Sequence, residues 1–82
     1  MQIQEPTTIN LRKLALQAVR DYATGNIEKH RYNVEVYLAN PAGIGEHPDV
    51  MESIQSELHK IAEYDDILEV LDKYFGELYY EA

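Results

Sequence analysis

The stretch LQAVRDYATGNIEKHRYNVEVY, residues 16–37, decides the fold of this 82-residue chain. Its apolar and ring-bearing residues recur three or four positions apart: Leu16, Val19, Ala23, Ile27, His30, Val34 and Tyr37. This spacing places them on one face of a single helix, and the phase continues across Gly25 without a reset. Residues 34–38 also alternate like a strand, but an isolated strand would have no partner, so we favour the helix.

The predicted first helix covers about residues 9–40. Thr7, Thr8 or Asn10 offers a side-chain oxygen to cap its start. Asn40 precedes a proline, which pushes it out of the helical region and ends the helix. Residues 1–8 are expected to form a flexible lead-in, and residues 41–47 a loop.

A second helix is predicted over about residues 48–75. Pro48 suits the first helical position, with His47 or Asp49 as the cap, and Gly76 suits the end. A continuous apolar stripe favours one helix, although a restart at residues 64–66 remains an alternative. The stripe consists of Val50, Ile54, Leu58, Ile61, Tyr64, Leu68, Leu71, Phe75 and Leu78.

Two helices of this length, about 45 Å each, are too long for a globule of 82 residues and should fold back as an antiparallel hairpin in one domain, residues 1–82. Each helix carries a second apolar stripe near the open end, away from the loop. These stripes are Leu11, Ala15, Ala18 and Tyr22 in the first helix and Ile67, Val70 and Tyr74 in the second. We therefore predict an all-α homodimer, as a four-helix bundle, with residues 76–82 packed on the body or on a partner.

Tyrosine is the main aromatic residue, with seven copies against one phenylalanine. Tyrosine is enriched at interfaces, where the ring is buried and the hydroxyl stays hydrated. For Tyr22 and Tyr74, an interface and the margin of the hairpin's own core are equally good interpretations. For Tyr64 we favour the core margin.

The charge is uneven along the chain, which has a net charge of −8 and a pI near 4.6. Four acidic and five basic residues give residues 1–43 a net charge of +1, whereas eleven acidic and two basic residues give residues 44–82 a net charge of −9. This acidity argues against direct nucleic-acid binding. In the hairpin, the basic residues Arg12, Lys13 and Arg20 should lie near the acidic residues Asp65, Asp66, Glu69, Asp72 and Glu77.

The composition excludes several further classes. Without cysteine the chain has no disulfide, thiolate metal site or cysteine nucleophile, which favours a reducing compartment. The amino terminus does not resemble a signal peptide, and no apolar run approaches the ~20 residues that cross a bilayer. We expect a cytoplasmic protein that does not bind membranes.

The sequence offers few candidates for chemistry. The loop-proximal residues Glu46, His47, Asp49 and Glu52 could hold a cation as part of a small metal-dependent enzyme, but helix capping and an acidic first turn explain them better. His30 is expected to pack opposite Leu58 with a bonded ring nitrogen, and His59 to be solvated. The Gly43–Gly45 segment suits a turn and lacks the pattern of a phosphate loop. We therefore assign no catalytic, cofactor-binding or metal-binding residue and expect a non-enzyme without a cofactor.

The runs VYLANPAGIGEHPD, residues 36–49, and IAEYDDILEVLDKYF, residues 61–75, resemble a family of small uncharacterised proteins of T4-like phages, notably marine cyanophage types. The resemblance covers about residues 10–76, and the Asn-Pro-x-Gly-Ile-Gly-Glu-His-Pro-Asp loop is its most specific part. Residues 24–26 and the Leu-Tyr-Tyr tail have no counterpart. The resemblance implies a phage-encoded protein that acts in the bacterial host cytoplasm or is packaged with the virion, and it carries over no activity.

Together these observations predict a homo-oligomeric interaction or structural module. The alternative is an acidic, DNA-mimic-like decoy that binds a basic nucleic-acid-binding protein of the host or phage. The acid-rich half is the basis of that alternative, although a solvated helix face that keeps the bundle soluble explains most of it.

Overall fold

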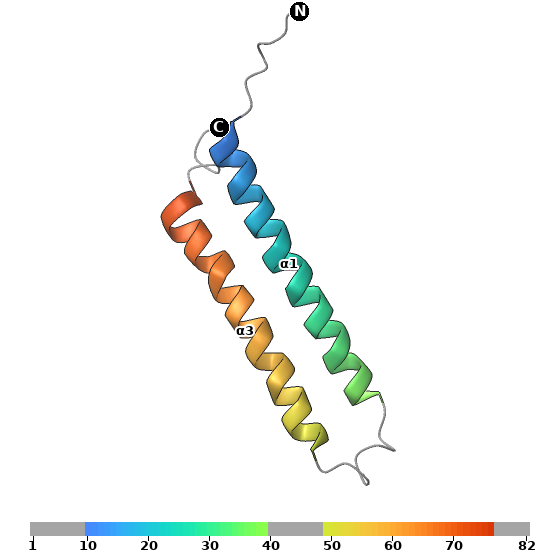
Figure 1. Ribbon diagram of the computed structural model, residues 1–82. Helices are drawn as coiled ribbons and strands as arrows, with labels where there is room; N and C mark the ends of the chain where they lie inside the picture. Colours follow the sequence, from blue (N-terminus) through green and yellow to red (C-terminus); the bar gives the residue numbers. More distant parts are fainter. Residues whose placement is uncertain (1–9, 40–48, 77–82) are drawn as a thin grey trace, which may run out of the picture.

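The computed structural model describes residues 10–39 and 49–76 as two long antiparallel helices joined into a hairpin (Figure 1). Helix α1 covers Leu11–Leu38 and helix α3 covers Val50–Phe75. The predicted all-α hairpin is thus confirmed, with each helix within two residues of its expected bounds. The predictions for the lead-in and the loop concern residues 1–8 and 41–47, which lie outside the described residues, and so does the predicted tail, residues 76–82, except for Gly76.

Helix α1 is continuous, as its apolar phase indicates. The Oδ1 atom of Asn10 accepts a hydrogen bond of 3.0 Å from the backbone N–H of Lys13, which caps the helix start. Gly25 lies within the helix, and residues 34–38 are helical, so the strand alternative is wrong. At the other end, the N–H of Ala39 still bonds to the carbonyl of Glu35.

Helix α3 begins two residues later than the sequence suggests. Asp49 occupies the cap position but makes no side-chain cap hydrogen bond. The helix continues through residues 64–66, so the restart considered there is wrong. Gly76 ends it with a φ of −92°, so this terminus does not use the left-handed conformation that often accounts for a glycine at this position.

The core between the helices is thin. Among the described hydrophobic residues only Ala23 and Leu71 are fully buried, with exposed fractions of 1% and 7%. Most other members of the predicted stripes are half-buried, as expected for a hairpin that covers one face of each helix. The predicted stripe places Leu58 in this core, but Leu58 is half exposed, and the neighbouring Glu57 faces α1 instead.

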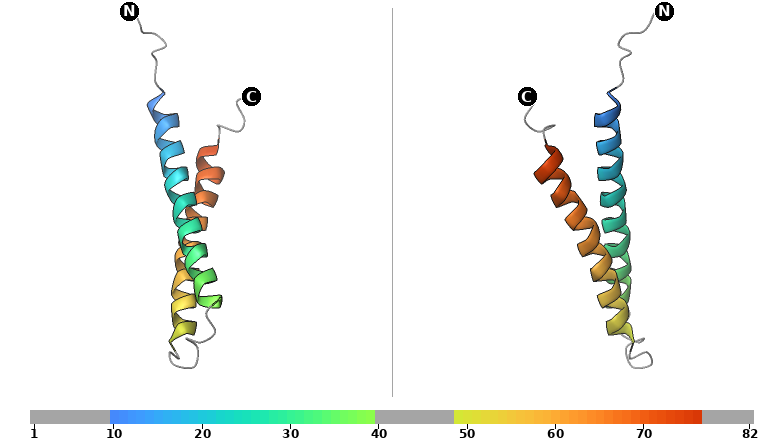
Figure 2. Two further views of the ribbon diagram at one scale, coloured as in Figure 1. Left: turned by 90° about the vertical axis from the view of Figure 1, so that its right-hand side faces the viewer. Right: turned by 60° about the vertical axis from the view of Figure 1, so that its left-hand side comes forward.

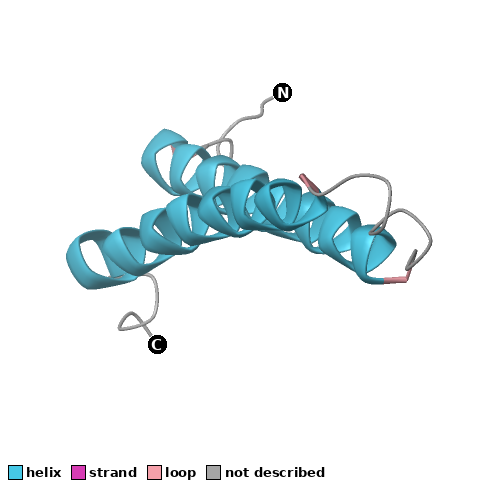
Figure 3. Cartoon of the chain, turned by 90° about the horizontal axis from the view of Figure 1, so that it is seen from below, coloured by secondary structure: helices cyan, strands magenta, loops and turns pink. Residues whose placement is uncertain are grey.

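The helices are not parallel along their whole length. They lie close together toward the loop and diverge toward the open end, where α1 begins and α3 finishes (Figures 2 and 3). At 1.5 Å per residue α1 is about 42 Å long and α3 about 39 Å long, so neither folds back into a compact core. Neither α1 nor α3 contains an apolar stretch long enough to cross a membrane.

Candidate interaction surface

A polar cluster joins the two helices in the half of the hairpin nearer the loop. The Oε1 atom of Glu57 lies 2.5 Å from Nδ1 of His30 and accepts a second hydrogen bond, of 3.1 Å, from Nδ2 of Asn33. An ionised carboxylate can only accept hydrogen bonds, so Nδ1 of His30 carries the proton. Both members of the His30–Glu57 pair are largely buried, with exposed side-chain fractions of 12% and 18%.

The same contacts determine how Glu57 titrates. Hydrogen bonds from His30 and Asn33 lower the pKa of the Glu57 carboxyl from its ordinary value of 4.5, outweighing partial desolvation, which acts to raise it. Electrostatic interactions with His30 and Lys29 lower the pKa of Glu57 further. Glu57 is therefore a structural carboxylate, held ionised between the helices.

Tyrosine rings extend this cluster toward the open end. The Tyr64 ring stacks on His30, with ring centroids 6.4 Å apart, and meets the Tyr22 ring edge-on at 5.9 Å. A hydrogen bond with Tyr22, together with partial burial, raises the pKa of the Tyr64 hydroxyl. Tyr64 lies at the margin of the hairpin core, as the sequence suggests, while Tyr22 is mostly exposed.

An apolar surface lies on one flank of the hairpin near its open end. Three of its large residues are mostly exposed: Leu11 at 71%, and Tyr22 and Tyr74 at 64% each. Successive helical residues are rotated by about 100°, which puts the members of each second stripe on the flank where Tyr22 meets Tyr64. We call this surface the open-end face, and it consists of Leu11, Ala15, Ala18 and Tyr22 of α1 with Ile67, Val70 and Tyr74 of α3.

The opposite flank is charged. Arg20 donates from Nη1 to Oδ1 of Asp72 at 2.9 Å, which confirms part of the charge pairing expected across the hairpin. Arg20 lies two residues from Tyr22, so on a helix the two side chains point to opposite flanks. The hairpin thus has one apolar and one charged flank at its open end.

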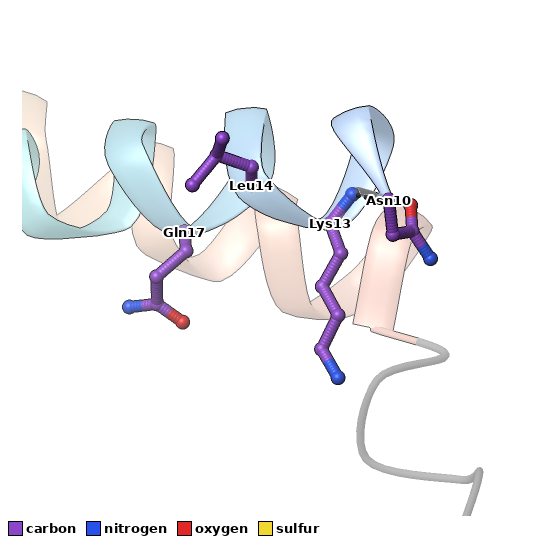
Figure 4. A pocket seen from close by; sticks show the side chains of 4 residues that line it. All are labelled: Asn10, Lys13, Leu14 and Gln17. Atoms are coloured by element: carbon purple, nitrogen blue, oxygen red, sulfur yellow. Dashed lines mark hydrogen bonds between the residues drawn. The ribbon is translucent and has the colours of Figure 1, made fainter. Parts of the chain in front are cut away.

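Three surface hollows lined by described residues do not form a ligand site. One lies at the start of α1, where Leu14 points to one side of the helix while Lys13 and Gln17 point to the other (Figure 4). Two further hollows lie on α3 alone. Because the polar groups do not converge, none of these hollows has the geometry expected of a binding pocket.

Only part of the set of candidate residues for chemistry lies within the described residues. Asp49 and Glu52 lie at the start of α3, while Glu46, His47 and the Gly43–Gly45 segment lie outside the described residues. Within the two described ranges, no group of three or more potential metal ligands is found. His59 is exposed on α3, as the sequence suggests.

Sequence reasoning did not single out Glu57 or Asn33. The interpretation of the acid-rich half as a solvated face predicts an exposed Glu57, yet its position three residues after Ile54 and four before Ile61 keeps it in phase with the buried face. That spacing, together with a histidine on the facing stripe, is the signal that could have identified the pair.

Comparisons with known proteins give no indication of function, so a functional assignment depends on the open-end face and the contacts described above. No protein-family model matches the chain, and neither a curated protein nor a solved structure is detectably similar to it.

Proposed function

We propose that this chain is a small interaction or structural module that associates with a second copy of itself through the open-end face. The observation that carries the proposal is the exposure of Leu11, Tyr22 and Tyr74 on one flank of a hairpin whose own core is thin. Large apolar residues gathered on one face of a small protein mark an interaction site.

The size of the face suits a dimer. A buried tyrosine contributes 150–250 Å², so the two exposed rings of Tyr22 and Tyr74 offer roughly 200–300 Å² between them. Leu11, Val70 and the adjoining helix surfaces add to this, toward the ~800 Å² per partner of a standard interface. Tyrosines at the centre of such a patch are typical anchors of binding energy.

A second copy is the preferred partner because it completes the architecture. Two helices bury one face each, and a second pair laid on the open-end face forms a four-helix bundle with a closed core. The same patch on both copies also satisfies the requirement of a two-fold symmetric interface, in which one surface must complement itself.

Sedimentation velocity at micromolar concentration tests the proposal. We expect a folded species of twice the 9.5 kDa chain mass. Tyr74→Ser should shift it toward the monomer, whereas Tyr32→Ser should not, because Tyr32, although 69% exposed, lies ten residues nearer the loop than Tyr22 and outside the open-end face. A wild-type chain that is helical by circular dichroism and sediments as a monomer overturns the proposal.

The alternative of an acidic decoy for a basic nucleic-acid-binding protein draws on the charge of α3, which has seven acidic and two basic residues. Asp72 pairs with Arg20 and Glu57 faces His30 within the hairpin. The other five acids, Glu52, Glu63, Asp65, Asp66 and Glu69, lie within about 160° of the helix circumference on the outer side of α3. A solvated helix face has the same arrangement, so the exposed apolar residues of the open-end face favour the dimeric module.

The decoy is tested by salt-reversible capture of a basic protein. The resemblance to phage proteins makes a lysate of phage-infected bacteria the appropriate source. A matched variant carrying Asp65→Asn, Asp66→Asn and Glu69→Gln separates the two outcomes. Capture that this variant abolishes supports the decoy, and equal capture by both chains excludes it.

A further inference from the structure

We infer that the two copies pack face to face through their open-end faces, with both open ends on the same side of the dimer. In this arrangement α3 of each copy lies on α1 of the other, and Tyr74 packs over Ala15 and Ala18. This inference rests on the proposed dimer and specifies its geometry. It follows from the relative heights of residues on the two helices, from their sizes and from their charges.

The contacts across the hairpin fix the heights. Arg20 bonds to Asp72, and in an antiparallel pair each step forward on α3 corresponds to a step back on α1. Tyr74, two residues beyond Asp72, therefore lies at the height of Ala15–Ala18. Large and small exposed residues thus stand side by side on the open-end face, a projecting ring on α3 and a shallow stretch of alanines on α1.

Two symmetric arrangements bring these faces together. A two-fold axis along the hairpin places α3 over the α1 of the other copy, so each Tyr74 ring meets the Ala15–Ala18 stretch. A two-fold axis across the hairpin places like helices together, so alanine meets alanine and tyrosine meets tyrosine. Only the first arrangement packs the projecting Tyr74 ring against the shallow Ala15–Ala18 stretch, as close packing at an interface requires.

Charge favours the same arrangement. Helix α1 has five basic and three acidic residues, a net charge of +2, whereas α3 has two basic and seven acidic residues, a net charge of −5. Stacking α3 on α1 joins opposite charges, and stacking α3 on α3 joins two acidic helices. By the same height rule, Lys29 of one copy comes to lie near Glu63 of the other, on the rim of the interface.

A pair of size-swapped variants tests the packing. Ala18→Phe places a ring where Tyr74 of the other copy must sit, and it should raise the dimer dissociation constant about tenfold or more, because overfilling a packed contact is costly. Adding Tyr74→Ala should restore much of the affinity, because the new ring fills the vacated space. Ala18 and Tyr74 are both exposed in the hairpin, so the variants should fold.

If like helices were paired, Tyr74→Ala would not compensate Ala18→Phe, and the two effects would simply add. That result overturns the inferred geometry while leaving the dimer intact. Circular dichroism of every variant establishes that the helices are retained, and sedimentation equilibrium supplies the dissociation constants.

Distances between spin labels give an independent test, because the chain has no cysteine of its own. A label at Glu35→Cys, toward the loop, should lie below roughly 40 Å from its counterpart, since axes of neighbouring helices are 8–10 Å apart. If like helices were paired, the two-fold axis would cross α1 near Ala18, which is 17 residues from Glu35. The two labels would then be about 50 Å or more apart, twice the rise of 17 residues.

A label at Gln17→Cys provides the control, because it lies near the open end in both arrangements. A short distance at both sites supports the inference. A short distance at residue 17 with a long one at residue 35 overturns it while keeping the dimer. The absence of any intermolecular distance at either site overturns the proposed dimer itself.

Discussion

Glu57 and His30, 27 residues apart in the chain, face each other across the hairpin with 2.5 Å between Oε1 and Nδ1. This contact links the two helices at one position along the hairpin. Glu57 is the only acidic residue among the half-buried residues of α3. A specific polar pair within an otherwise apolar seam favours one register over its neighbours, which apolar side chains alone discriminate weakly. The His30–Glu57 pair therefore fixes the register of α1 against α3 in a long hairpin whose core is thin.

Replacing Glu57 should be costly because it leaves His30 and Asn33 without their shared acceptor. We expect Glu57→Ala to lower the free energy of unfolding by about 1–3 kcal/mol, the range for a buried polar group deprived of its partner. Urea denaturation at a fixed protein concentration measures this. Glu69→Ala, at an exposed position on the same helix, is the control and should change stability by less than about 0.5 kcal/mol. Equal effects would show that the Glu57 contact adds nothing specific.

Acid should weaken the same contact. The pKa of Glu57 is below 4.5 in the folded chain and returns to about that value on unfolding, so the unfolded chain binds more protons in the interval between the two. The stability that the carboxylate supplies is fully present above pH 4.5 and is lost as the pH falls through the folded value. The stability difference between wild type and Glu57→Gln should therefore be largest near neutral pH and shrink below pH 4.5. A difference independent of pH would contradict this.

Periodicity predicted the helices and their buried faces well because a hairpin repeats one local rule along its length. It placed His30 on the packed face and kept the phase across Gly25, and the structure agrees with both. The partner of His30 was misplaced by one residue, at Leu58 instead of Glu57. Register across a hairpin depends on the loop and on how the helices cross, and neither is encoded in the spacing of one helix. In a sequence, a glutamate such as Glu57 is also predicted to be solvated unless a partner such as His30 is known to face it.

Gly25 should be replaceable with a gain in stability. It lies inside α1 without a positive φ, and a Cβ added there would meet no atom within 4 Å. Gly25→Ala should then stabilise the chain by roughly 0.5–1 kcal/mol, since alanine leaves less backbone freedom to lose on folding. Thermal melting should show a rise of several degrees, and Ala62→Gly, exposed on α3, should show a comparable fall. A decrease for Gly25→Ala would indicate that the glycine is needed for close approach of a second chain.

The start of α1 depends on one side chain. Asn10 accepts from the N–H of Lys13 at 3.0 Å, and the first turn has no acidic residue to stabilise the helix dipole instead. Asn10→Ala should cost about 1 kcal/mol, whereas Asn10→Asp should retain or slightly increase stability, because aspartate caps equally well and adds a favourable charge. Hydrogen exchange of the amides of residues 11–14 gives the local readout, and protection should fall in the alanine variant while α3 is unchanged. Equal protection in the two variants would show that contacts at the open end, and not the cap, hold this turn.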